Sequence, residues 1–159
     1  MIFITLGSQK FQFNRLLKAI DDLIERRIIT EEVFAQSGYS DYIPKNYKFK
    51  QFLDREEFAE WEAKADIIIT HGGTGAIIGA VKKGKKVIAV PRLCKYGEHV
   101  DDHQLQLIAQ FKEQNLICGV DDCSELEKAL NYVKNHKFNI YKSNTQKYLE
   151  SIENFLCKR

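Results

Sequence analysis

The sequence predicts an α/β fold in which helices cover both faces of a parallel sheet, a Rossmann-like, doubly wound arrangement. Short apolar runs suited to buried strands alternate along the chain with segments of helical periodicity. Glycine or proline ends three of these runs, at Gly7, Gly72 and Pro91. The length of 159 residues suits one compact domain over residues 1–159, with a hydrophobic core of its own.

Apolar runs and a capping pattern define the elements in the first half of the chain. Residues 11–27 place apolar side chains three and four positions apart, which predicts a helix. Asp54, followed three residues later by Glu57, has the capping-box pattern that begins a helix, here extending through residue 65. The apolar runs predict strands over residues 1–6, 32–36, 47–49 and 66–70.

The second half of the chain repeats this alternation. A glycine-rich turn precedes a helix, and Pro91 stops the strand that follows. The predicted helices cover residues 74–83, 99–114, 123–135 and 141–156, and the predicted strands cover 86–90 and 116–120. Because ligands of such sheets collect beyond the carboxyl ends of the strands, the loops at Gly7, Gly72 and Pro91 should line one crevice.

The glycine-rich turn before residue 76 is the most informative segment. Gly72, Gly73 and Gly75 remove side chains where a ligand could approach the backbone. The following helix directs free N–H groups and the positive end of its dipole at the turn, which is the geometry of a diphosphate site. The motif is neither the dinucleotide fingerprint, which should follow the first strand, nor a P-loop. A tight turn with no ligand is the alternative.

Polar side chains gather at the start of the helix predicted over 99–114. They are His99, Asp101, Asp102, His103, Gln104 and Gln106. One such residue is enough to cap a helix. Two histidines four positions apart would need a third fixed ligand to hold a metal ion, so no metal site is expected. Hydrogen bonding to a polyhydroxylated ligand such as a sugar is preferred, with Asp102 and Gln104 as contacts.

Composition excludes several classes of function. The 24 basic and 22 acidic residues are interspersed, which argues against a dedicated nucleic-acid binder. No apolar run approaches the ~18 residues of a membrane span, and the first residues lack the pattern of a signal peptide. The four cysteines match no zinc template, which predicts reduced thiols and a cytoplasmic protein. Residues 82–86 are locally basic, either as a solvated helix end or as a contact for an anionic ligand or a membrane surface.

Three motifs together resemble a known family. HGGTG at 71–75, GK-x-VIAVP at 84–91 and H-x-x-DHQ at 99–104 resemble the carboxyl-terminal domain of glycosyltransferase family 28. The opening TLGSQKFQFNRLLKAID is similar to the small PssE-like subunits of bacterial exopolysaccharide and capsule synthesis, and to their eukaryotic relative, the Alg13 subunit. The resemblance extends over residues 2–155. It implies the carboxyl-terminal, UDP-sugar-binding half of a GT-B glycosyltransferase.

The resemblance also implies a donor site. Residues 71–75 would hold the UDP diphosphate, Phe52 and Leu53 would lie at the uracil, and residues 102–104 would contact the sugar hydroxyls. The side chains of Phe52 and Leu53 could equally belong to the core. The implied donor-binding residues are Gly7, Ser8, Phe52, Leu53, His71, Gly72, Gly73, Thr74, Gly75, Arg92, His99, Asp102, His103 and Gln104. The two-domain relatives carry a ribose-binding acid in the helix after the turn, where this chain has Gly79.

The implied reaction is an inverting, metal-independent transfer of a hexose, of galactose or GlcNAc type, from a UDP-sugar to a lipid-linked saccharide in exopolysaccharide or capsule biosynthesis. No cofactor is expected. A membrane-anchored PssD-like or Alg14-like subunit would bind the acceptor, supply the general base and hold this chain at the inner face of the membrane. The alternatives are a non-catalytic enhancer of a partner transferase and a hydrolytic or epimerising enzyme. Self-association of an isolated chain is also open, because a surface shaped for a missing half exposes apolar groups.

Overall fold

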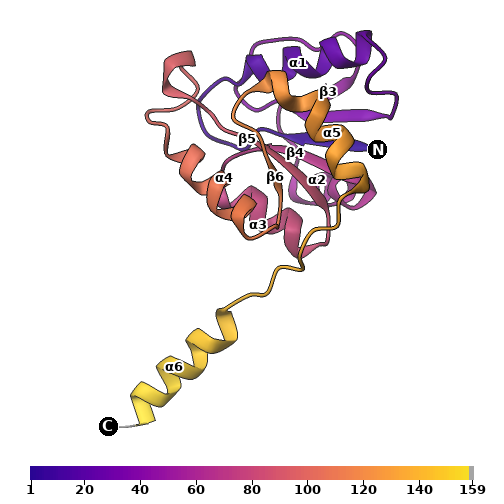
Figure 1. Ribbon diagram of the computed structural model, residues 1–159. Helices are drawn as coiled ribbons and strands as arrows, with labels where there is room; N and C mark the ends of the chain where they lie inside the picture. The colour runs from indigo at the N-terminus through magenta and orange to yellow at the C-terminus, as the bar shows by residue number, and fades with distance from the viewer. Residues whose placement is uncertain (158–159) are drawn as a thin grey trace.

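The computed structural model describes residues 1–157 and shows a sheet of six parallel strands in the order β3-β2-β1-β4-β5-β6 (Figure 1). The strands are β1 (Ile2–Thr5), β2 (Val33–Gln36), β3 (Lys48–Lys50), β4 (Ile67–His71), β5 (Lys86–Val90) and β6 (Cys118–Gly119). The order reverses between β1 and β4, which is the switch point where ligands bind in doubly wound sheets. The predicted fold class is therefore confirmed, and the strand over 86–90 has the predicted bounds.

Helices cover both faces of the sheet (Figure 1). They are α1 (Asn14–Glu25), α2 (Arg55–Lys64), α3 (Thr74–Lys82), α4 (His103–Glu113), α5 (Leu126–Asn135) and α6 (Thr145–Cys157), with short 3-10 turns η1 (Cys94–Tyr96) and η2 (Cys123–Glu125). One core joins α1 and α5 to the sheet residues Ile4, Ile69 and Ile88. The other joins α3 and α4 to Phe3 and Ile68 on the opposite face. Side chains alternate between the faces of a strand, so neighbouring residues serve different cores.

Local hydrogen bonds explain where predicted and observed boundaries differ. The capping box is confirmed, since the Asp54 carboxylate accepts from the Glu57 N–H and the Glu57 side chain accepts from the Asp54 N–H. The helix predicted from residue 99 begins only at His103. Asp102 accepts from the Cys94 N–H at 2.7 Å and Asp101 from the His103 N–H at 3.1 Å. Such side-chain bonds to the backbone compete with helix formation.

The lysines of the basic segment 82–86 hold the amino edge of the sheet together. Lys85 Nζ donates to the carbonyls of Ala63 and Ala65, and Lys86 Nζ donates to those of Val133 and Lys134, all within 2.9 Å. These carbonyls end α2 and α5, where a cation stabilises the helix dipole. A hollow of about 540 Å³ at this edge is thus lined by ammonium groups that already have partners. The contacts favour a structural role over the binding of an outside anion.

The last element lies apart from the sheet. Figure 1 shows α6 extending away from the domain after an irregular segment. None of the helices within the described residues is both long and apolar enough to cross a bilayer. Cys94, Cys118 and Cys123 are free thiols, as the spacing predicted.

Candidate functional site

The carboxyl edge of the sheet brings the predicted loops together. Thr5, at the end of β1, pairs with Thr70, and Val90, at the end of β5, pairs with His71. The loops after these strands therefore begin side by side. The first turns of α3 and α4 lie at the same edge, as the hydrogen bond from the Gly72 N–H to Gln104 Oε1 shows. The segments expected from the sequence to line one crevice thus lie together at this edge.

The imidazole of His71 fills the space beneath the glycine turn. Its Nδ1 accepts from the Gly73 N–H at 3.0 Å, and the residue is only 8% exposed. A Cβ at Gly73 would lie 2.1 Å from His71 Cε1, and one at Gly7 would lie 2.6 Å from Nε2. Gly7 also has φ +72°. Both glycines are thus required by the packing of His71, a reason that the sequence did not indicate.

Gln104 joins the glycine turn to the end of β5. Its Oε1 accepts from the N–H groups of Gly72 and Arg92, each at 3.0 Å, and the residue is 2% exposed. A Cβ at Gly72 would lie 2.7 Å from Gln104 Cβ. In this arrangement the carboxamide is turned inward and fixes the turn. Its contact with sugar hydroxyls stays a prediction.

The start of α3 offers backbone donors to a ligand. Gly73 is the N-cap residue, and within residues 1–157 no side chain caps this helix. The first N–H bonded inside the helix is that of Ile77, which donates to the Gly73 carbonyl. The N–H groups of Thr74, Gly75 and Ala76 therefore have no acceptor within α3. Such N–H groups, together with the helix dipole, are able to bind an anion.

A hollow of about 380 Å³ runs from this helix start between α2 and α3. Arg55 and Phe58 of α2 line one side, and Gly75 and Gly79 of α3 line the other. A Cβ at either glycine would meet nothing within 4 Å. Unlike Gly72 and Gly73, these two glycines leave open space. Glu62, paired with Lys83, also lines this hollow.

Gly79 gives a direct test of this open space. A Gly79→Ala substitution is expected to stabilise the fold by about 0.5–1 kcal/mol, because alanine is the better helix former and its methyl group meets no atom. Chemical denaturation of both proteins measures the difference. A loss of stability would show that the hollow is closed in solution. Gly84→Ala is the contrasting variant, since Gly84 has φ +70° and should lose stability.

Arg92 lies inside the protein rather than at the mouth of the site. It is 1% exposed, and its guanidinium donates to the carbonyls of Leu6, Phe11 and Gln12 at 2.6–3.1 Å. Burial lowers its pKa to about 10, so it remains charged at neutral pH. Arg92 therefore ties the loop after β1 to the loop after β5. The family resemblance had placed Arg92 at the mouth of the donor site.

An ion pair between Arg15 and the buried Glu98 was missed from the sequence. Arg15 Nε and Nη2 donate to the two carboxylate oxygens of Glu98 at 3.0 Å each. Glu98 is fully buried and also accepts from the Leu93 N–H. The two residues are 83 positions apart, so no local pattern could have joined them. Their bonds fix the loop that leads into α4.

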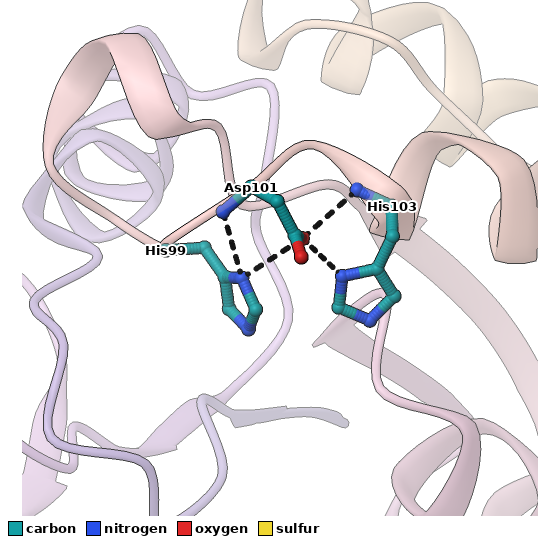
Figure 2. A group of neighbouring side chains, drawn as sticks. All are labelled: His99, Asp101 and His103. Carbon is teal, nitrogen blue, oxygen red and sulfur yellow. Dashed lines mark hydrogen bonds and ion pairs between the residues drawn. The ribbon is translucent and has the colours of Figure 1, made fainter.

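A cluster of three side chains is formed by His99 and Asp101 of that loop and by His103, the first residue of α4. Figure 2 shows the rings of His99 and His103 turned toward the carboxylate of Asp101. The hydrogen bond from His103 holds the pKa of Asp101 below its usual value. His103 is exposed at the surface while His99 is buried against Phe11, with ring centroids 5.5 Å apart.

The structure also describes the surroundings of Phe52, Leu53 and Ser8. Phe52 is 38% exposed and packs edge-on against Tyr39. Leu53 is half-buried against the second core, and its N–H donates to Gln36 Oε1 at 3.1 Å. That N–H is thus engaged within the protein. Ser8 is exposed next to Gly7.

The buried imidazole of His71 makes the fold sensitive to acid. Burial, and then the charges of Arg92 and His99, lower the pKa of His71 to about 4. The unfolded chain binds this proton near pH 6.5, so the stabilisation is complete above pH 6.5 and is lost as pH falls to 4, by about 3 kcal/mol. Denaturation at a series of pH values should show the slope. His71→Asn should flatten it and His136→Gln should not; an unchanged slope in His71→Asn would contradict this assignment.

The sequence pattern of the glycosyltransferase family 28 C-terminal domain matches residues 1–156. The chain belongs to this family. Two solved structures have a similar fold, which agrees with a family 28 domain. They are MurG of Acinetobacter baumannii (TM-score 0.59, 19% identity, covering 84% of this chain and 41% of that one) and the glycotransferase of kitacinnamycin (TM-score 0.61, 14% identity, covering 85% and 35%).

Two curated relatives of this family 28 chain carry the name UDP-N-acetylglucosamine transferase subunit ALG13. The Kluyveromyces lactis protein is 30% identical over 92 residues, which are 55% of this chain and 45% of that protein. The human protein is 25% identical over 140 residues, which are 81% of this chain and 12% of that protein. The chain thus matches less than half the length of each relative.

Proposed function

We propose that this chain is the donor-binding subunit of a glycosyltransferase that moves a sugar from a UDP-sugar to a lipid-linked saccharide. The observation that carries the proposal is the start of α3, where uncapped N–H groups open onto a hollow of about 380 Å³. A diphosphate fits the N–H groups, and a nucleoside fits a hollow of this size. Membership of family 28 supports the same reaction class.

In the proposed reaction, the diphosphate lies at the N–H groups of Thr74, Gly75 and Ala76. The departing UDP gains negative charge as the bond to the sugar breaks. Backbone donors and a helix dipole fixed in advance stabilise that charge, and they require no divalent ion for this step. His71 and Gln104 hold the turn in place from below. The nucleophile is a hydroxyl of the acceptor, and its general base belongs to a partner subunit.

The uridine would extend from the diphosphate into the hollow between α2 and α3. Gly75 and Gly79 leave a flat wall, and Arg55 and Phe58 line the opposite side. The two-domain relatives have an acid in α3, at the position of Gly79. In this chain the carboxylate that lines the hollow is that of Glu62, which belongs to α2. We assign ribose recognition to this wall of α2.

The acceptor and the partner follow from the same proposal. A membrane-anchored PssD-like or Alg14-like subunit would bind the lipid-linked saccharide and keep this chain at the cytoplasmic face of the membrane. The names of the two curated relatives support a UDP-GlcNAc donor and a subunit of a larger transferase. The alternative donor is UDP-galactose, with a role in exopolysaccharide or capsule synthesis. The resemblance of the opening segment to PssE-like subunits supports this alternative.

Transfer of labelled sugar by the reconstituted pair tests the proposal. We expect transfer from UDP-sugar to the lipid acceptor only when this chain is present. Gly75→Leu should abolish transfer and UDP binding without unfolding the chain, because its Cβ enters only the hollow. Ala63→Leu, a matched change at an exposed position of α2, should leave both unchanged.

The enhancer alternative predicts a different outcome. If this chain is a non-catalytic subunit, the wild-type chain and the Gly75→Leu variant should stimulate the partner transferase to the same extent. Equal stimulation would therefore overturn the proposed donor site. Release of free sugar without acceptor would instead indicate a hydrolase.

A further inference from the structure

His99, Asp101 and His103 bring three metal-binding side chains to one point. One ligand atom from each lies within 4.8 Å of the other two. Figure 2 shows both rings and the carboxylate converging from alternate positions of a five-residue segment. The sequence supplied two histidines and two aspartates without fixing a third ligand, and the fold places Asp101 between the two rings.

The three atoms that converge can each offer a lone pair to a metal ion, His103 Nδ1 once its proton has moved to Nε2. His99 Nδ1 lies 3.2 Å from Asp101 Oδ1, and the Asp101 N–H approaches the same nitrogen at 3.4 Å. His103 Nδ1 also contacts Asp101 Oδ1, and the two rings have centroids 4.9 Å apart. Ligands bound to one tetrahedral zinc ion at 2.0–2.2 Å lie roughly 3.3 Å from each other. The observed separation of His99 and Asp101 matches that spacing.

The surrounding structure fixes both ends of this segment. His99 is 8% exposed and lies against Phe11, and the preceding Glu98 is held by Arg15. At the other end His103 begins α4, and Gln104 is bound to the glycine turn. Because the ligands lie within five residues, closing the chain around an ion costs little entropy.

We propose that His99, Asp101 and His103 bind a divalent transition-metal ion, of which Zn²⁺ and Co²⁺ are the best probes. Two imidazoles and one carboxylate suit these ions, whereas Ca²⁺ and Mg²⁺ prefer sites made of oxygen atoms. Asp101 and His103 have side chains 56% and 47% exposed, so water can complete the coordination. The bound ion would hold the loop after η1 against the start of α4.

The ion would lie beside the proposed donor site, since the resemblance also implies His99 and His103 as donor contacts. The diphosphate donors belong to α3, whereas the metal ligands lie in the loop after η1 and at the first residue of α4. Binding of the ion can therefore be measured without substrate, and failure of either proposal leaves the other standing.

Titration of the full chain, without a histidine tag, tests the site. Calorimetric titration should show that Zn²⁺ binds with one-to-one stoichiometry. Addition of Co²⁺ should produce the visible absorption band of a low-coordinate cobalt ion. Nitrogen NMR of the histidine rings should show Zn²⁺ at Nδ1 of His99 and His103. Absence of saturable binding, or coordination through Nε2, would overturn the proposal.

Substitutions locate the ion. Loss of an outer-shell partner alone weakens metal sites by about 10–100-fold, so Asp101→Asn and His103→Gln should each weaken binding by about tenfold or more. In the Asp101→Asn variant the carboxamide oxygen can still accept from the backbone N–H of His103. Circular dichroism should show that both variants fold. His136→Gln removes a histidine that bonds to Asn115 elsewhere and should not change affinity. Equal affinity in all four proteins would show that the ion binds at another place.

Discussion

A Gly73→Ala substitution is expected to lower the rate of sugar transfer by about 100-fold and to destabilise the fold by about 1–3 kcal/mol. The new methyl group would lie 2.1 Å from His71 Cε1. The ring cannot retreat, because on its other side Nε2 lies beneath Gly7. The glycine turn must therefore move, and with it the N–H groups proposed to hold the diphosphate. Steady-state transfer and thermal unfolding of the same preparation measure the two effects.

Gly75→Ala is the matched control, two residues further along the same turn. Its Cβ meets no atom within 4 Å, so the fold should be as stable as that of the wild type or slightly more stable. Equal destabilisation by the two substitutions would mean that the turn responds to any added methyl group. The assignment of Gly73 to the packing of His71 would then be wrong.

The sequence predicted the fold because its signals are local. Alternating apolar runs, the capping box at Asp54 and the glycine turn each lie within a few residues, and the six parallel strands follow from them. The errors have local causes too. Asp101 and Asp102 bond to nearby backbone N–H groups, and α4 begins four residues later than predicted.

The candidate site was only partly predictable because its contacts are long-range. The sequence placed the glycine turn and the polar start of α4 correctly at one edge of the sheet. It could not show that Gly7 and Gly73 make room for His71, or that Gln104 reaches Gly72 across 32 positions. Gly79 illustrates the converse. In the sequence, Gly79 stands where the two-domain relatives have an acid, which marked a departure from the family. The structure shows open space at Gly79, and Glu62 lines the same hollow.

Arg92→Met is expected to destabilise the protein by at least about 3 kcal/mol, a fall in melting temperature of roughly 6–12 °C. Methionine can fill the volume, yet it donates no hydrogen bond. The carbonyls of Leu6, Phe11 and Gln12 would lose this donor in a buried position. The loops after β1 and β5 would then separate. Thermal unfolding and UDP binding should both be measured.

Comparison of Arg55→Met with Arg92→Met distinguishes an arginine that faces a ligand from one that holds the fold together. Arg55 is exposed at the edge of the hollow between α2 and α3, so its loss should leave the melting temperature unchanged and weaken UDP binding. The resemblance to family 28 placed Arg92 at the mouth of the donor site. That role predicts for Arg92→Met an unchanged melting temperature and weaker UDP binding, instead of the loss of stability expected from its burial. A stable Arg92→Met protein that no longer binds UDP would show that the guanidinium leaves its carbonyl contacts to meet the donor. A strongly destabilised one would show that the guanidinium of Arg92 serves the protein interior.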